Sequence, residues 1–341
     1  MGVKLNFSVE DRRAIILRAV VEAYIGSAGP VGSAQIASLP EISVSSATIR
    51  NAMYSLEKEG YLAQPHTSAG RIPTEKGYRR YVDELMTSVE LGSEPSDTID
   101  SFFSSAYYEI DDLLSATTTL LTNLTNCAAI VTGPSPQKTQ ILAVQLIGLN
   151  QHSVIAVIVD ENGSVEKRTI EWPTYTNESD LREISILLTE HFKDKEARDV
   201  SVAPIGSNTG LNALLELAFS AVKDAIRNAE NSGVFISGTS RVVQSFDAVE
   251  TVRGIVSILE RHFMVLGLMR SVLASGHGVA IGSEHGLSSL KECAIVVAPY
   301  SVDGVQMGTI GLIGPTRMNY GSVIGAAKVV SQNLGRRLSE G

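Results

Sequence analysis

Hydrophobic and polar positions in the first ninety residues alternate at the spacing of short amphipathic helices. A first helix is expected to begin at Ser8, with Asp11 as a capping partner. Its buried stripe would consist of Ile16, Ala19, Val20, Ala23 and Tyr24. The run GSAGPVG at 26–32 then ends the helix, and Ser33 is expected to cap a second, short helix over residues 34–39.

The following segment, residues 44–80, predicts a helix, a hairpin and another helix. Ser45 or Ser46 would cap the third helix, and the inward positions at i, i+3, i+4 and i+7 are Ile49, Ala52, Met53 and Leu56. Gly60 stops this helix; residues 61–66 and 71–73 are predicted strands around a turn at 67–70. Thr74 would cap a helix running to Met86, with Tyr78, Val82 and Leu85 facing inward. This order of elements is typical of a winged helix-turn-helix.

Beyond residue 86 the pattern changes several times. Residues 87–96 have the composition of a linker, and a helical stretch follows to about residue 124. Three β-rich runs at 141–149, 153–160 and 164–170 predict an antiparallel meander, with Asn162-Gly163 marking one hairpin. Helical signal covers 175–235 and 249–273. Two strands at 293–298 and 305–313 flank Asp303-Gly304, and a last helix covers 323–338. The fold class is therefore α+β, with several domains.

The net charge of −9 is unevenly distributed. Residues 1–90 carry ten basic and ten acidic side chains, so the remainder of the chain accounts for the whole negative balance. Residues 45–82 hold six basic and three acidic side chains, which gives a local charge of +3. A basic segment inside an acidic protein is what a nucleic-acid contact requires.

The third helix carries the side chains that could read base edges. Short polar residues at a helix start allow close approach to the major groove, Arg pairs with guanine, and Asn pairs with adenine. The outward positions of this kind are Ser45, Ser46, Thr48, Arg50, Asn51 and Tyr54. The competing interpretation is an ordinary solvated helix face, which would be preferred for a helix without the flanking elements.

The hairpin is the second candidate contact, through phosphate or the minor groove. Its polar and basic side chains are Gln64, His66, Thr67, Ser68 and Arg71. The competing interpretation is an ordinary surface hairpin, because some of these also carry such residues. Arg79 and Arg80 are weaker candidates for phosphate contacts.

Catalytic and metal chemistry have little support. His277, His285 and Cys293 lack a paired-ligand motif, so no metal site is expected. Gly308, Gly311 and Gly314 lie within a strand and do not open a helix as a dinucleotide motif does. Cys127 stands in an apolar context. We therefore expect no enzyme activity and no cofactor.

The two cysteines and the absence of an apolar leader or spanning run favour a cytoplasmic protein without a membrane partner.

Three N-terminal segments resemble the HrcA family of bacterial heat-shock repressors: GPVGSAQIA (29–37), VSSATIRNAMYSLEKEGYL (44–62) and QPHTSAGRIPTEKGYRRYVDELM (64–86). Two C-terminal segments, IVVAPY (295–300) and IGPTRMNYGSVI (313–324), are similar to that family's blocks as well. Two positions depart from the family pattern: Ala52 stands where an acidic residue is usual, and Asn319 where Asp is usual. We expect a change of packing at Ala52, since it faces inward.

The resemblance implies a homodimeric repressor of chaperone operons that binds double-stranded DNA at an inverted-repeat operator of the CIRCE type. It also implies a GAF-like core, an inserted dimerisation domain and a GroEL-type chaperonin that keeps the repressor active. The corresponding domains are a winged helix-turn-helix (1–88), a linker (89–96), the core's first part (97–174), the insert (175–245) and the core's second part (246–341).

Two alternatives belong to other functional classes. A GAF-like core could bind a metabolite that switches DNA affinity, an analogy of fold alone. The second alternative is an enzyme that uses Cys293 with a nearby His. Heat sensing needs no ligand, because a dimer of marginal stability loses function over a small temperature rise.

Overall fold

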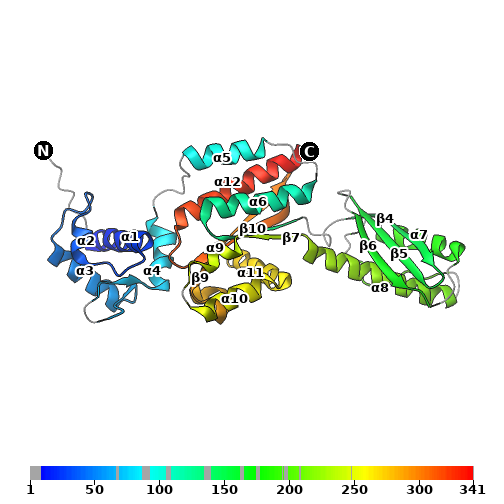
Figure 1. Cartoon of the computed structure of the whole chain (residues 1–341), viewed down its shortest axis with the longest axis horizontal. Coiled ribbons are helices and arrows are strands. Elements are labelled where there is room, and N and C mark those ends of the chain that lie inside the picture. The colour runs from blue at the N-terminus through cyan, green and yellow to red at the C-terminus, as the bar shows by residue number, and fades with distance from the viewer. Residues whose placement is uncertain are drawn as a thin grey trace. The chain divides into compact units, whose positions relative to one another are not determined.

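The computed structural model describes residues 9–340, apart from 67–68, 87–92, 105–108, 134–139, 162–164, 174–176, 194, 196–198, 207–208 and 247. The chain divides into two compact units. Unit 1 combines Met1–Val131 with Ile236–Gly341, and unit 2 is Thr132–Phe235. Unit 1 itself contains an N-terminal module (residues 9–86) and a core (residues 93–131 and 236–340), both visible in Figure 1.

The N-terminal module has the element order that the sequence predicts. Its elements are α1 (Val9–Ser27), α2 (Ser33–Ala37), α3 (Ser46–Lys58), β1 (Leu62–Ala63), β2 (Ile72–Pro73), α4 (Glu75–Arg80) and a π-helical turn (Tyr81–Leu85). The two strands pair antiparallel, Leu62 opposite Pro73 and Ala63 opposite Ile72. They are shorter than predicted. A bridge between Val31 and Arg71 extends the hairpin toward α2.

Of the four predicted helix caps, those at Ser45 and Thr74 are confirmed, and Ser8 lies outside the described residues. The Ser45 hydroxyl accepts the Thr48 N–H at 3.2 Å, and the Thr74 hydroxyl accepts the Gly77 N–H at 3.1 Å. Each bond satisfies one of the amides left free at a helix start. The Ser33 prediction is wrong, because Gly32 is the N-cap of α2 and makes no side-chain cap. Ser33 instead contacts α3: its hydroxyl lies 3.0 Å from that of Ser46.

The inward face of α3 is largely as predicted. Ile49, Met53 and Leu56 are buried, whereas Ala52 is only half-buried. Within α4, Tyr78 is buried as predicted. In the turn that follows, Val82 and Leu85 are only half-buried, and Tyr81 is buried instead. The cause is the π-helical turn, in which the Met86 N–H donates to the Tyr81 carbonyl five residues earlier. An i+5 turn rotates the following positions away from the face predicted by 3.6-residue spacing.

The core of unit 1 is a five-stranded sheet with helices on both faces. Its strands run in the order β7 (Val234–Ser237), β3 (Ala128–Thr132), β10 (Val305–Pro315), β9 (Cys293–Val302) and β8 (Val279–Ile281). The long helix α12 (Tyr320–Ser339) packs on β9 and β10, beside α5 (Ser93–Phe103) and α6 (Ile110–Thr125). Helices α10 (Val249–Leu259) and α11 (His262–Ala274) lie on the opposite face (Figure 1). The short α9 (Thr239–Val243) and two 3₁₀ turns, η3 (Gly282–His285) and η4 (Ser288–Leu290), complete the core.

One local feature of this core agrees with the sequence analysis, and a second explains a departure from the family pattern. The β9–β10 hairpin turns at Asp303 and Gly304, both with positive φ, as an Asp-Gly pair allows. Asn319 is the N-cap of α12, and its side-chain oxygen accepts the Ser322 N–H at 3.2 Å. Because Asp caps a helix in the same way, Asn at this position retains the function of the residue usual in the resembled family.

Unit 2 is a three-stranded antiparallel sheet with two helices on one face. The strands β4 (Ile141–Asn150), β5 (Ser153–Asp160) and β6 (Val165–Glu171) run in that order, which confirms the predicted meander. Helices α7 (Glu178–Phe192) and α8 (Thr209–Ser232) pack on them around one hydrophobic cluster that includes Trp172, Phe192 and Phe219. The Asn162-Gly163 turn lies outside the described residues.

The position of the meander differs from the sequence-based boundaries. Those placed residues 97–174 in the core and began the insert at 175, ending it at 245. In the structure the meander shares its hydrophobic cluster with α7 and α8, so the compact unit spans 132–235. Strand patterns alone do not show which sheet a strand joins, and this is why the boundary was placed too late.

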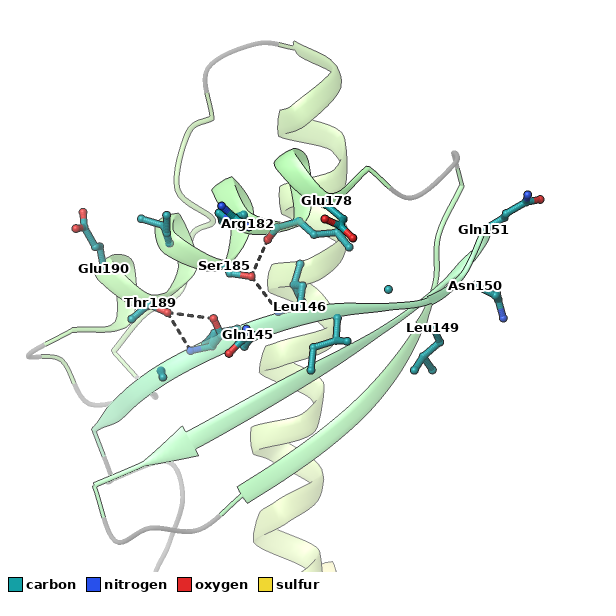
Figure 2. Close-up of a pocket in the computed structure, with 16 residues that line it drawn as sticks. Gln145, Leu146, Leu149, Asn150, Gln151, Glu178, Arg182, Ser185, Thr189 and Glu190 are labelled. Atoms are coloured by element: carbon teal, nitrogen blue, oxygen red, sulfur yellow. Dashed lines mark hydrogen bonds between the residues drawn. The ribbon is translucent and has the colours of Figure 1, made fainter.

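Along β4, the outer edge of this small sheet is closed by hydroxyl groups from α7. The Val144 N–H donates to the Thr189 hydroxyl at 2.9 Å, and that hydroxyl donates to the Val144 carbonyl at 3.1 Å. The Leu146 N–H donates to the Ser185 hydroxyl at 2.9 Å. Figure 2 shows both side chains reaching from α7 toward β4, in the wall of an open pocket of about 920 Å³.

The face of this sheet that α7 and α8 leave uncovered carries apolar side chains in two rows, and Gln145, Val157 and Lys167 form the row between them. Cross-strand pairs place Ala143, Val159 and Val165 in one row and Ile147, Ile155 and Thr169 in another. The side chains of Ile147 and Val165 are 45% and 50% exposed. Within the described residues, no helix is both long and apolar enough to span a bilayer.

Candidate nucleic-acid interface

Five of the predicted contact residues border one concavity of the N-terminal module. It measures about 660 Å³ and lies between α3, the start of α2 and the β1–β2 hairpin. Its lining includes Arg50, Asn51, Tyr54, Gln64 and Arg71. The sequence-based set is thus brought together from two separate stretches of chain. Its arginine and amide side chains offer hydrogen-bond donors and acceptors of the kind that contact nucleic acids.

On α3, the exposed face carries Arg50, Asn51 and Tyr54. Met53 and Ile49 turn into the module and fix the rotation of the helix, so these three side chains remain outside. Lys58 lies one turn beyond Tyr54, with its ammonium 4.7 Å from the ring centroid. Lys58 was not among the predicted contacts, although the i, i+4 spacing to Tyr54 is visible in the sequence.

The hydroxyls at the start of α3 already have partners. Ser45 caps the helix and lies 2.9 Å from the Thr48 hydroxyl, while Ser46 contacts Ser33 of α2. Each hydroxyl retains further hydrogen-bonding capacity, since an O–H is one donor and two acceptor sites. Ser33 is a second residue that the sequence analysis missed, because its contact depends on the turn between α2 and α3.

In the hairpin, one predicted contact residue stabilises the loop and another is exposed to solvent. The Gln64 amide donates to the Ala69 carbonyl at 3.2 Å, and His66 is exposed at the tip. Thr67 and Ser68 lie outside the described residues. A Cβ added at Gly70 would lie 2.3 Å from the Val31 carbonyl oxygen, so the hairpin backbone packs directly on the α1–α2 connection.

Arg71 has a partner inside the module. Its guanidinium donates to Glu57 through Nε at 3.0 Å and lies 2.8 Å from the same carboxylate through a terminal nitrogen. The Arg71 side chain is 17% exposed. Its backbone also exchanges two 2.9 Å hydrogen bonds with Val31. Arg71 therefore joins the hairpin to α3 and to the α2 connection, which makes it a residue that positions the hairpin.

Arg79 and Arg80, the weaker candidates, are engaged in ion pairs. Arg80 pairs with Glu84 and Glu10 inside the N-terminal module. Arg79 pairs with Asp83 and with Glu284 of the core. Bonding to Glu284 raises the pKa of Arg79 against the opposing effect of burial.

Outside this interface, the residues considered for other chemistry have structural roles. His285 is buried, and its two ring nitrogens meet the Leu290 carbonyl at 2.9 Å and the Leu287 N–H at 3.3 Å. Burial raises the pKa of Cys127 to about 11 and that of Cys293 to about 12. In the described part of the chain, no three His, Cys, Asp or Glu side chains gather as a metal centre requires.

Comparison with known proteins decides the family. Residues 111–324 match the family model described as the HrcA protein C terminal domain. The heat-inducible transcription repressor HrcA of Pelotomaculum thermopropionicum is 33% identical, with 97% of each chain covered. The chain belongs to the HrcA family.

Other relatives agree in name and extent. The heat-inducible transcription repressor HrcA of Clostridium perfringens strain SM101 is 34% identical, over 97% of this chain and 99% of its own length. Among solved structures, one titled as a hypothetical protein at 2.2 Å resolution aligns with a TM-score of 0.58 and 21% identity. It covers 98% of this chain and 99% of that one, and it supports the overall α+β fold of this HrcA-family protein.

Proposed function

We propose that this chain is a heat-inducible transcription repressor that binds an inverted-repeat operator as a homodimer. In this proposal the N-terminal module is a winged helix-turn-helix, α3 reads the major groove and the β1–β2 hairpin is the wing. The core of unit 1 is the GAF-like domain, and unit 2 is the inserted dimerisation domain. The working site of such a repressor is the cytoplasm.

One observation carries the DNA-binding part of the proposal. Arg50 and Asn51, exposed on α3, border the same concavity as Gln64 of the hairpin. Arg binds guanine O6 and N7 through two N–H groups, and Asn binds adenine N6 and N7 in the same two-point manner. Arg71, held by Glu57, would position the wing and leave base reading to α3.

A gel-shift titration tests this assignment. The probe is a duplex carrying the family's inverted repeat, compared with duplexes in which either or both half-sites are scrambled. Arg50→Ala should weaken specific binding by about 1–3 kcal/mol and relax the preference at one base pair of each half-site. Arg253→Ala, which removes an exposed arginine of α10 in the core, is the matched control and should leave binding unchanged. Wild-type discrimination in the Arg50 variant would reject α3 as the reading helix.

The homodimer part rests on the uncovered apolar face of unit 2. A second copy related by a two-fold axis would present the same three rows to their own image: Ala143–Val159–Val165, Gln145–Val157–Lys167 and Ile147–Ile155–Thr169. Burial of such a face favours association through the hydrophobic effect. An operator with two inverted half-sites requires this symmetry from its repressor.

The temperature response would follow from the stability of the active dimer. A GroEL-type chaperonin that binds the inactive chain and returns it to the folding-competent state would set the active fraction. Operator occupancy should then fall with a small rise in temperature and recover when purified chaperonin and ATP are added. Occupancy that does not respond to chaperonin at any temperature would remove this part and leave DNA binding intact.

A further inference from the structure

Within unit 1, the N-terminal module is fastened to the core through one side of α4. The Arg79 guanidinium bonds to both carboxylate oxygens of Glu284, through Nε at 2.9 Å and through a terminal nitrogen, and also donates to the Val279 carbonyl at 2.9 Å. One turn earlier, the Glu75 carboxylate accepts the Ser283 N–H at 3.1 Å and the Ser283 hydroxyl. We call this set of contacts the α4 junction.

The junction combines charge with close packing. The Glu284 carboxylate is itself fixed in position, because it also accepts the Ile281 N–H at 2.8 Å. Gly282 has φ +57, and a Cβ there would lie 2.1 Å from a Glu75 carboxylate oxygen. The Tyr78 ring lies 5.9 Å from that of Tyr320, at the start of α12. A bidentate carboxylate–arginine pair fixes orientation as well as distance.

The orientation set at α4 is passed on to α3. Lys76 donates to the Glu59 carbonyl at the end of α3 at 2.8 Å, and the Thr74 hydroxyl donates to the Gly60 carbonyl at 2.6 Å. A Cβ at Gly77 would lie 2.2 Å from the Tyr61 carbonyl oxygen, so α4 packs directly on the backbone that follows α3. The direction of α3 relative to the core sheet therefore follows from the α4 junction.

We propose that Arg79 and Glu284 are positioning residues that set which half-site spacing the repressor accepts. This inference rests on the proposed function, a dimer on an inverted repeat. In such a dimer the distance and angle between the two reading helices depend on how each module is fixed to its core. The spacing of half-sites then becomes a geometric property of the protein. With the junction broken, each module would search for its half-site independently, and spacing would matter less.

Arg80 provides a matched comparison. It lies next to Arg79 on α4 and carries the same charge, but its ion pairs with Glu84 and Glu10 stay inside the N-terminal module. Removing Arg80 changes the charge near DNA by the same amount and leaves the junction contacts in place. The pair Arg79→Ala and Arg80→Ala therefore separates the junction from a general loss of positive charge.

The experiment measures binding of the full-length protein to a series of duplexes. The series contains the inverted repeat at its natural spacing, the same repeat with the spacer lengthened or shortened one base pair at a time over half a helical turn, and a single half-site. For the wild type, affinity should fall about a hundredfold when one half-site is rotated to the opposite face of the duplex. For Arg79→Ala and Glu284→Gln, the difference in affinity between the natural and the rotated spacing should shrink to about threefold. Binding at the natural spacing should weaken about tenfold, and binding to the single half-site should not change. Arg80→Ala should keep the wild-type profile, and the exchanged pair Arg79→Glu with Glu284→Arg should recover part of the spacing preference.

Several results would overturn the inference. One is an unchanged spacing profile in both single variants. Equal flattening by Arg80→Ala is another. Uniformly tighter binding at every spacing would mean that the junction holds the module away from DNA. Failure of the proposed function looks different, since the wild type would then show no preference for two half-sites over one.

Discussion

The two sheets of this protein are covered to different degrees. In unit 1, β9 and β10 have helices on both faces, and residues 293–297 of β9 and 308–314 of β10 are all buried. In unit 2, α7 and α8 cover one face, and the opposite face shows apolar side chains at its surface. The first arrangement makes a scaffold that tolerates little change. The second leaves exposed apolar side chains, and their burial against a partner would favour association.

The largest expected effect is in the covered sheet. Gly335 of α12 approaches β9 so closely that a Cβ would lie 2.3 Å from the Ser301 carbonyl oxygen. Gly335→Ala must push helix and sheet apart, and we expect a loss of about 3 kcal/mol in the free energy of unfolding. Urea denaturation followed by circular dichroism measures it. Gly267→Ala in α11 has no neighbour within 4 Å and should gain up to about 1 kcal/mol from helix propensity.

The uncovered sheet should respond in association and not in folding. Ile147→Asp places a charge on the open face, and we expect dimer dissociation to rise at least tenfold, about 1.4 kcal/mol, in sedimentation velocity. Ile205→Asp is the control, since this side chain in unit 2 is 85% exposed but is not on the sheet. A dimer equally stable in both variants would show that the two-fold contact lies elsewhere.

A moderate effect is expected where α7 closes the β4 edge. Thr189→Val keeps the shape of the side chain and removes the hydroxyl that bonds both Val144 backbone groups. The cost should be about 1–2 kcal/mol of unfolding free energy, because two half-buried backbone groups lose their partner. Thr169→Val, on the open face of the same sheet, should change stability by less than about 0.5 kcal/mol. Similar values for the two variants would contradict a sealing role for Thr189.

The smallest effect is kinetic and belongs to the covered sheet again. With the pKa of Cys127 raised to about 11 and that of Cys293 to about 12, on the order of one thiol in a thousand or fewer is ionised at pH 8. Native protein should resist alkylation, measured by mass spectrometry, while urea-unfolded protein reacts at both sites.

The same two shifts set a dependence on pH. Because both folded pKa values are raised, the folded state keeps protons that the unfolded state releases. Their contribution to stability is complete below the ordinary thiol pKa and is lost as pH rises through the folded values. Denaturation midpoints should therefore fall above about pH 9. A Cys127→Ala and Cys293→Ala double variant should lose that part of the slope.

Local chemistry explains which elements could be predicted. Ser45 and Thr74 cap helices through partners three residues away, and the Asp303-Gly304 turn needs only its own two φ angles, so sequence suffices. The short strand β8 is buried at each of its three positions, and a continuous apolar run has no alternation to reveal a strand.

The candidate site divides in the same way. The exposed face of α3 follows from the spacing of Ile49, Met53 and Leu56. The bond between Arg79 and Glu284 spans 205 positions of sequence, and no local pattern indicates it. Arg71 is a residue type that often contacts DNA. In the structure, however, it pairs with Glu57 of α3 inside the module. Long-range pairing is what the sequence pattern leaves open.

The hydroxyl groups along β4 also determine how far this protein can assemble. An uncovered apolar sheet invites stacking, and an open strand edge invites further strands, which together lead to fibres. Here Ser185 and Thr189 bond the outward backbone groups of Val144 and the Leu146 N–H on one edge. The other edge strand, β6, carries Glu166, Lys167, Arg168 and Glu171. Both features disfavour growth along the sheet. In the proposed dimer, the contact that remains is face to face between two copies.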